Sequence, residues 1–272
     1  MKLTISLGQM DVRLGDPAGN LRTVAAMTAE AARRGSDVVV FPELWSTGYD
    51  LENAAAYATP TDTGIFAAVA NLAREHGVAI LGSCLALLGP GQIGNTALFV
   101  GPQGQVWGEY SKMHLFRLMA EEQYLTAGSR PGLIPTPWGC PAGVAICYDL
   151  RFPELLRQYA LQGARLLFLP AEWPHPRLTH WQTLLRARAI ENQMFVVGCN
   201  RVGSSKGSTF CGHSAVVDPW GELVIEGDER PGLLTATIDT ALADEVRARI
   251  PVFADRRPEL YAPAAGGQDG VD

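Results

Sequence analysis

Apolar residues either alternate with polar ones or form short unbroken runs along most of the chain. Residues 2–8 (KLTISLG) alternate as a half-buried strand does, whereas 37–41 (DVVVF) is apolar after its first residue, as in a strand buried on both faces. Between them, the Ala-rich segment 18–35 has the apolar spacing of an amphipathic helix and closes on a glycine. The chain therefore begins with a strand, a helix and a second strand.

The same alternation continues to about residue 226. Helices are predicted over 63–76, 153–163 and 180–192, and strands near 78–88, 95–101, 104–110, 143–147, 165–169, 194–199 and 213–226. This order predicts an α/β fold in which helices cover a mixed sheet. We expect one domain over residues 1–262, followed by a disordered C-terminal tail over 263–272.

Composition narrows the class of partner. The 272-residue chain is 47% hydrophobic and has a formal net charge of −6, which argues against a nucleic acid or an anionic membrane as its main partner. The N-terminus lacks the features of a secretory signal, and no apolar run approaches the roughly 18 residues of a transmembrane helix. We therefore expect a cytoplasmic protein that binds neither nucleic acid nor membrane.

The spacing of cysteines and histidines argues against structural crosslinks. The five cysteines form no CxxC pair and are odd in number, so we expect free thiols in a reducing compartment. The five histidines are scattered, without the spacing of zinc ligands. The sequence therefore predicts no metal and no cofactor.

Three reactive residues lie at the ends of predicted strands. Glu43 follows the strand DVVVF, Lys112 ends QVWGEYSK, and Cys147 ends GVAIC. Ligands of α/β folds gather at the carboxyl ends of strands, so side chains far apart in sequence can converge there. We expect these three to share one site.

Cys147 has two interpretations. Between a strand and a helix it would sit on a sharp bend, where backbone N–H groups and the helix end would favour the thiolate and could hold an oxyanion. A buried structural cysteine is the simpler interpretation for one residue alone. We apply that interpretation to the remaining cysteines, Cys84, Cys140, Cys199 and Cys211.

Three separated segments resemble the nitrilase superfamily of carbon–nitrogen hydrolases. They are FPELWSTGY (41–49), YSKMHLF (110–116) and ICYDLRFPE (146–154), and the resemblance runs from about residue 3 to about residue 261. It implies an α-β-β-α sandwich that usually pairs into a homodimer, with Glu43, Lys112 and Cys147 as the catalytic residues. Glu121 matches a second family glutamate because it lies seven residues before a glycine.

Amide hydrolysis requires a nucleophile, a base, an acid for the leaving nitrogen, and positive charge for the oxyanion. Cys147 would attack after Glu43 takes its proton, and Lys112 with the backbone N–H of Tyr148 would hold the oxyanion. The resulting thioester would be hydrolysed by water that Glu43 activates. Glu121 would orient Lys112 or the substrate amide.

The segment AEWPHPR (171–177) follows a predicted strand and should overhang the site. Trp173 is expected to form a pocket wall, and Arg177 could bind a substrate carboxylate, although a capped loop beside a dimer interface is the rival interpretation. Together with KMHLFRLMAEEQYLTAG (112–128), this segment resembles the ω-amidases, which hydrolyse 2-oxoglutaramate and related small amides. Nitrile and N-carbamoyl amino-acid hydrolysis use the same three catalytic residues and remain open.

Other classes of function are possible. Cys147, His213 and Asp218 occur in the order found in papain-like thiol proteases, so a Cys/His protease or acyltransferase is one alternative. A non-enzymatic redox-sensing protein would keep Cys147 without needing Glu43 or Lys112.

Asp149 and Arg151 are expected to pair and fix the turn after Cys147.

Overall fold

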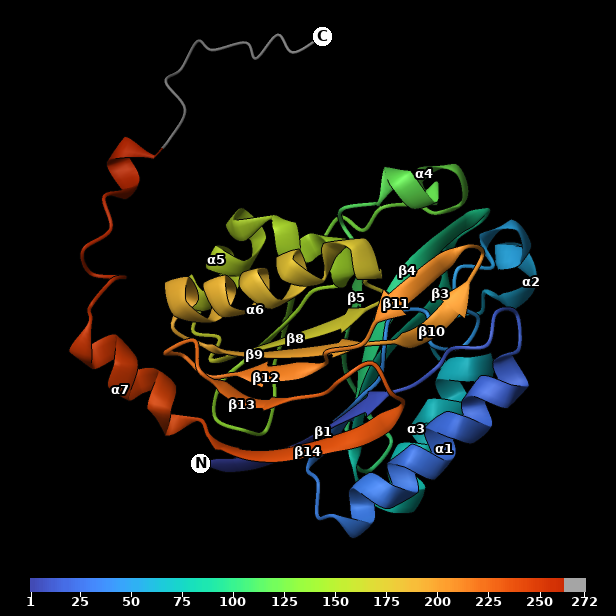
Figure 1. The fold of residues 1–272 in the computed structure, drawn as a ribbon, viewed down its shortest axis with the longest axis horizontal. Coiled ribbons are helices and arrows are strands. Elements are labelled where there is room, and N and C mark those ends of the chain that lie inside the picture. The colour runs from blue at the N-terminus through green and yellow to red at the C-terminus, as the bar shows by residue number, and fades with distance from the viewer. Residues whose placement is uncertain (262–272) are drawn as a thin grey trace, which may run out of the picture.

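The computed structural model describes residues 1–261 and contains two six-stranded sheets packed face to face (Figure 1). The predicted tail, 263–272, lies outside the described residues. The first sheet has the order β14-β1-β2-β3-β4-β5, with bounds β1 Lys2–Gln9, β2 Val38–Val40, β3 Ala79–Gly89, β4 Gln92–Val100, β5 Val106–Ser111 and β14 Gly232–Asp239. The second has the order β13-β12-β9-β8-β7-β6, with bounds β6 Gly132–Ile134, β7 Ala142–Val144, β8 Leu166–Ala171, β9 Phe195–Asn200, β12 Ala215–Val217 and β13 Leu223–Glu226.

Helices cover the outer face of each sheet (Figure 1). The α-helices are α1 Pro17–Arg33, α2 Ala54–Tyr57, α3 Gly64–His76, α4 Glu121–Tyr124, α5 Pro153–Leu161, α6 Leu178–Asn192 and α7 Ala241–Arg249. The 3-10 helices are η1 Leu51–Asn53, η2 Arg117–Met119, η3 Cys147–Arg151, η4 His175–Arg177 and η5 Pro258–Leu260, and a separate ribbon pairs β10 Val202–Ser205 with β11 Ser208–Cys211.

Apolar alternation accounts for the layers. Leu3, Ile5 and Leu7 of β1 are buried in a core that also holds Val144 and Leu167 of the second sheet. A second cluster lies on the other face of the first sheet, where Val39 packs with apolar residues of α1 and α3. Helices α5 and α6 cover the second sheet with side chains such as Leu156 and Trp181. The predicted α-β-β-α sandwich is confirmed.

The centre of each sheet is parallel and its margins are antiparallel. β1, β2 and β3 run parallel in the first sheet, as β7, β8 and β9 do in the second. Parallel strands of one sheet end at the same edge, so the residues that follow β7 and β8 can meet. The packing of the two sheets brings the segment after β2 to the same place, where the N–H of Glu172 contacts Glu43. This arrangement places the candidate site.

Two expectations need correction at the level of elements. The strand predicted over 143–147 ends at Val144, and Cys147 instead begins the 3-10 turn η3. The long strand β14 was not predicted, yet it closes the first sheet by pairing antiparallel with β1.

Within residues 1–261, the helices are all too short or too polar to span a bilayer.

Candidate active site

Lys112 lies at the centre of a buried ionic cluster. Its Nζ is 2.7 Å from Oε1 of Glu43 and 2.6 Å from Oε1 of Glu121, and the three side chains are shielded from solvent. The structure therefore brings the predicted Glu43, Lys112 and Glu121 together. The two carboxylates outweigh burial and raise the pKa of Lys112, so its ammonium stays charged.

Glu43 is held at both carboxylate oxygens. Oε1 accepts hydrogen bonds from Nδ2 of Asn95 at 2.8 Å and the hydroxyl of Tyr49 at 2.9 Å, in addition to Lys112. Oε2 accepts the backbone N–H of Glu172 at 2.9 Å. A carboxylate with this many donors keeps one orientation, which suits a group that must meet a reacting atom at short range.

The loop between Lys112 and Gly128 explains the position of Glu121. The N–H of Gly128 donates to the carbonyl of Lys112 at 2.8 Å, so the loop returns to the strand from which it left. A Cβ at Gly128 would lie 2.0 Å from the carbonyl oxygen of Ser111, so only glycine fits. Oε2 of Glu121 also accepts the N–H of Phe116 at 2.8 Å, which aims Oε1 at Lys112.

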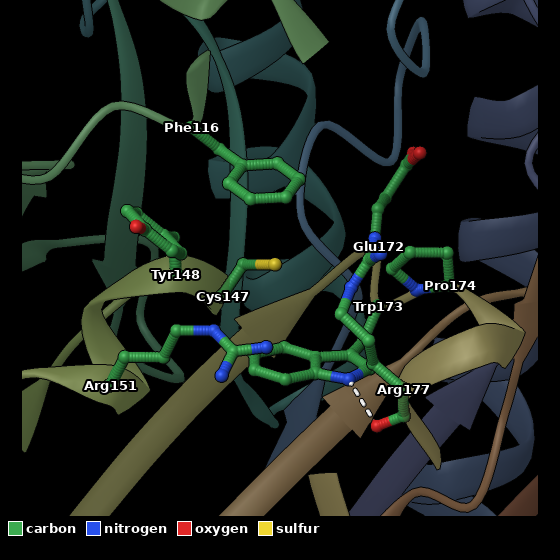
Figure 2. Close-up of a pocket in the computed structure, with 8 residues that line it drawn as sticks. All are labelled: Phe116, Cys147, Tyr148, Arg151, Glu172, Trp173, Pro174 and Arg177. Carbon is green, nitrogen blue, oxygen red and sulfur yellow. Dashed lines mark hydrogen bonds between the residues drawn. The ribbon is translucent and has the colours of Figure 1, made fainter. Parts of the chain in front are cut away.

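Cys147 sits on a strained bend at the start of η3. Its φ of 44° is in the left-handed region that non-glycine residues rarely adopt, and such strain is common at functional sites. Its side chain lies among the pocket residues, below the ring of Phe116 in the view of Figure 2. The predicted sharp turn is therefore present.

Asp149 fixes this bend, although not through the expected pairing with Arg151. Its Oδ2 accepts the N–H of Ile146 at 2.8 Å and the hydroxyl of Tyr110 at 2.7 Å, and its Oδ1 accepts the N–H of His114 at 3.1 Å. Asp149 thus ties the cysteine turn to the segment that carries Lys112. Arg151 instead faces His180 and Trp173.

The pKa of the Cys147 thiol is shifted in the direction opposite to the expectation. Burial, followed by the adjacent charge of Glu43, raises the pKa of the thiol well above its usual value, and Lys112 offsets only part of this effect. The prediction that the turn would favour the thiolate is therefore wrong for the resting site. The proton must leave during the attack, and the Glu43 carboxylate is placed to accept it.

A small pocket opens above the thiol (Figure 2). It encloses no more than about 240 Å³ and is lined by Phe116, Cys147, Tyr148, Arg151, Glu172, Trp173, Pro174 and Arg177. Trp173 forms a wall as predicted, and its Nε1 donates to the carbonyl of Arg177 at 2.9 Å. The guanidinium groups of Arg151 and Arg177 lie over the rings of Trp173 and Phe116, at 4.7 Å and 5.5 Å.

Three buried polar residues of this site were missed from the sequence. Tyr49 ends the motif that contains Glu43, so the motif itself carried the signal. Asn95 lies inside an ordinary strand, and nothing in the local pattern distinguishes it. Glu172 stands beside Trp173 in the overhanging segment, where a lone carboxylate in an apolar run was the available signal.

The alternative built on His213 is not supported by the geometry. Nδ1 of His213 lies 2.9 Å from Oε1 of Glu226, and Asp218 accepts the backbone N–H groups of Trp220 and Glu222. Neither residue lines the pocket of Cys147. The cysteines assigned a structural role, Cys84, Cys140, Cys199 and Cys211, are buried and free.

Similarity to known proteins agrees with this geometry. Residues 4–248 match the family model described as carbon-nitrogen hydrolase. The 2-oxoglutaramate amidase of Bacillus subtilis (strain 168) is 44% identical over 261 residues, covering 96% of this chain and 100% of that protein.

Solved structures of carbon–nitrogen hydrolases and amidases are also similar to this chain. A CN-hydrolase superfamily protein from Xanthomonas campestris, with an arsenic adduct in its active site, has a TM-score of 0.88 at 35% identity and covers 94% of this chain and 98% of its own. A mutant of the amidase from Nesterenkonia sp. AN1, which shows the result of Michael addition of acrylamide at its active-site cysteine, has a TM-score of 0.84 at 29% identity. That match covers 95% of this chain and 98% of the amidase chain.

Proposed function

The chain belongs to the carbon–nitrogen hydrolase family, and on that basis we propose that it hydrolyses short ω-amides of dicarboxylic acids, such as 2-oxoglutaramate, to the acid and ammonia. The observation that carries the catalytic part is the buried Lys112 ammonium between Glu43 and Glu121. The relative named 2-oxoglutaramate amidase supports the substrate class.

Acylation begins with attack of the Cys147 sulfur on the amide carbonyl. Glu43 accepts the thiol proton as the C–S bond forms, which gives a tetrahedral intermediate with a negative oxygen. One N–H of Lys112, beyond the two that bind carboxylates, and the N–H of Tyr148 in the first turn of η3 stabilise this oxygen. Glu43 then returns the proton to the nitrogen, and ammonia leaves a thioester behind.

In deacylation, water is the nucleophile and the sulfur of Cys147 is the leaving group. Glu43 takes a proton from water, the hydroxide oxygen attacks the thioester carbonyl, and the Cys147 thiolate leaves and is reprotonated. Glu121 does not contact the reacting atoms in this scheme. It positions Lys112 through the 2.6 Å contact and adds the second carboxylate that keeps the ammonium charged.

Two cations at the pocket favour an anionic substrate. Burial lowers the pKa of Arg151, and the nearby charge of Arg177 lowers it further because the two guanidinium groups repel each other. A substrate carboxylate would relieve this repulsion and can be held in bidentate fashion by Arg177. The pocket is also small and walled by the aromatic rings of Phe116, Tyr148 and Trp173, which favours a short acyl chain.

The substrate class is tested by ammonia release from a panel of compounds. We expect turnover of 2-oxoglutaramate and succinamate, and much slower turnover of a neutral amide of equal length such as butyramide. Nitriles and N-carbamoyl amino acids serve as competing classes. Turnover of either class without turnover of the ω-amides would contradict the substrate proposal while leaving the mechanism in place.

Arg177→Ala is expected to raise the KM for succinamate by about 10- to 100-fold, since a charge-assisted hydrogen bond contributes about 1.5–3 kcal/mol. The kcat for succinamate and the kcat/KM for butyramide should change little. Arg22→Ala, on the exposed side of α1, is the matched control. An equal loss on both substrates would show that Arg177 shapes the pocket rather than binding a carboxylate.

The homodimer and the cytoplasmic location stay predictions from the sequence.

A further inference from the structure

Glu172 is a buried carboxylic acid that the mechanism above does not use. It directly follows β8, is 1% exposed, and gives its backbone N–H to Oε2 of Glu43 at 2.9 Å. Figure 2 shows its side chain turned away from the thiol of Cys147, although its residue lines the same pocket. The backbone of Glu172 therefore faces the active site, and its carboxyl faces the interior.

The carboxyl of Glu172 is attached to a fixed cation. Its Oε2 lies 3.2 Å from Nη1 of Arg201, a fully buried residue that follows β9. Arg201 donates through Nη2 to the carbonyl of Val12 at 2.7 Å and lies 4.3 Å from the ring centre of Phe210. Since Arg201 is held from several sides, it can act as an anchor for Glu172.

The other oxygen, Oε1 of Glu172, is buried without a hydrogen-bond partner within the described residues. The charged groups that act on this carboxyl are Arg201, Glu43 and Lys112, and Arg201 also pairs with Asp11 at 3.2 Å. Burial raises the pKa of Glu172 to about 8, against the opposing charge of Arg201. Glutamine matches this side chain in shape and keeps an oxygen that can accept from Arg201.

We propose that Glu172 is a positioning residue for the catalytic base: its side chain, anchored on Arg201, holds the N–H that fixes Oε2 of Glu43 toward Cys147. This inference rests on the proposed role of Glu43. It assigns to Glu172 no contact with substrate. Losing the anchor should let the Glu43 carboxylate rotate away from the thiol, while the pocket and its cations remain.

The test compares Glu172→Gln, Glu172→Asp and Glu172→Leu. The first readout is alkylation of Cys147 by iodoacetamide at pH 7, in which the sulfur displaces iodide and its proton passes to Glu43. We expect Glu172→Gln to react within threefold of the parent protein, because its amide oxygen can accept from Arg201. Glu172→Leu should react at least 10-fold more slowly, and Glu172→Asp should fall between them because its shorter side chain draws away from Arg201.

The second readout separates positioning from binding. With succinamate as substrate, Glu172→Leu should lower kcat at least 10-fold and change KM less than threefold, and glutamine should restore kcat. Glu226→Leu is the matched control, because this half-buried carboxylate binds His213 outside the pocket. Circular dichroism establishes that each variant is folded.

The inference is overturned if Glu172→Leu alkylates at the parent rate, or if glutamine is as slow as leucine. If the Glu172→Leu protein does not fold, the Glu172→Asp protein serves as the test in its place. Rates of alkylation and turnover equal to those of the parent protein in Glu172→Asp would then overturn the inference. Alkylation does not require amide turnover. A parent protein that is alkylated at Cys147 but hydrolyses none of the amides contradicts the proposed substrate, and the alkylation rates still decide the role of Glu172.

Discussion

Replacing Cys147 by alanine is expected to lower kcat/KM for the best ω-amide by at least about 1,000-fold, the scale of effect seen when a catalytic nucleophile is removed. The four remaining cysteines are buried and lie outside the pocket, so none can replace the lost sulfur. Alanine removes only the sulfur from the strained turn, so the fold should persist. Ammonia release and circular dichroism measure the two effects.

The control for this experiment is Cys84→Ala, a cysteine that is 2% exposed and packs in the cluster beneath α1 and α3. Its loss should cost some stability and leave kcat/KM unchanged. Mass spectrometry after quenching the reaction should find an acyl adduct on Cys147 in the parent protein. Retention of more than a tenth of the activity in Cys147→Ala would overturn the thioester mechanism.

Lys112→Met is expected to abolish activity and also to destabilise the protein by about 3–5 kcal/mol, because it leaves two buried carboxylates without their shared cation. Burial already raises the pKa of Glu121 with Lys112 present, and loss of the cation should raise it further. A carboxyl whose pKa is higher in the folded state stabilises the fold at low pH and less as the pH rises. The deficit in stability should therefore be larger at pH 8 than at pH 5.

Urea unfolding at the two pH values measures this dependence, with Lys206→Met as the matched control. Lys206 is a half-exposed residue paired with Glu52 at the surface, so its loss should change the free energy of unfolding by no more than about 1 kcal/mol. A Lys112→Met protein as stable as the parent at pH 8 would show that the two glutamates do not both depend on this ammonium.

Local pattern predicted most of the elements but not their neighbours in the sheets. The runs that form β2 and β8 are continuously apolar, and α3 ends at the predicted residue, because each signal lies within its own segment. β14 is different: its residues GLLTATID are mostly half-buried, and they become a strand by pairing with β1, more than 220 residues away. Such pairing depends on tertiary structure, which local periodicity does not contain.

The same limit applies to the site. Glu43, Lys112 and Cys147 could be predicted because all three lie at the ends of predicted strands, where ligands of α/β folds gather, and because their motifs resemble a known family. Asn95 could not, since an asparagine within a strand gains meaning only when Glu43 lies beside it. The thiolate prediction was wrong because it counted local dipoles and not burial, which is a property of the whole fold.

The proposed base and the proposed nucleophile belong to different sheets. Glu43 follows β2 of the first sheet, and Cys147 follows β7 of the second. A nascent chain that ends after β5 and Lys112 already contains Glu43 and Lys112, but Cys147 and the strands of the second sheet have not yet been made. Hydrolytic competence should therefore appear late in biosynthesis, when the two sheets dock, and a partly folded chain would be inert toward the amides of the cell. Recovery of activity during refolding would then time the docking of the sheets rather than the formation of helices.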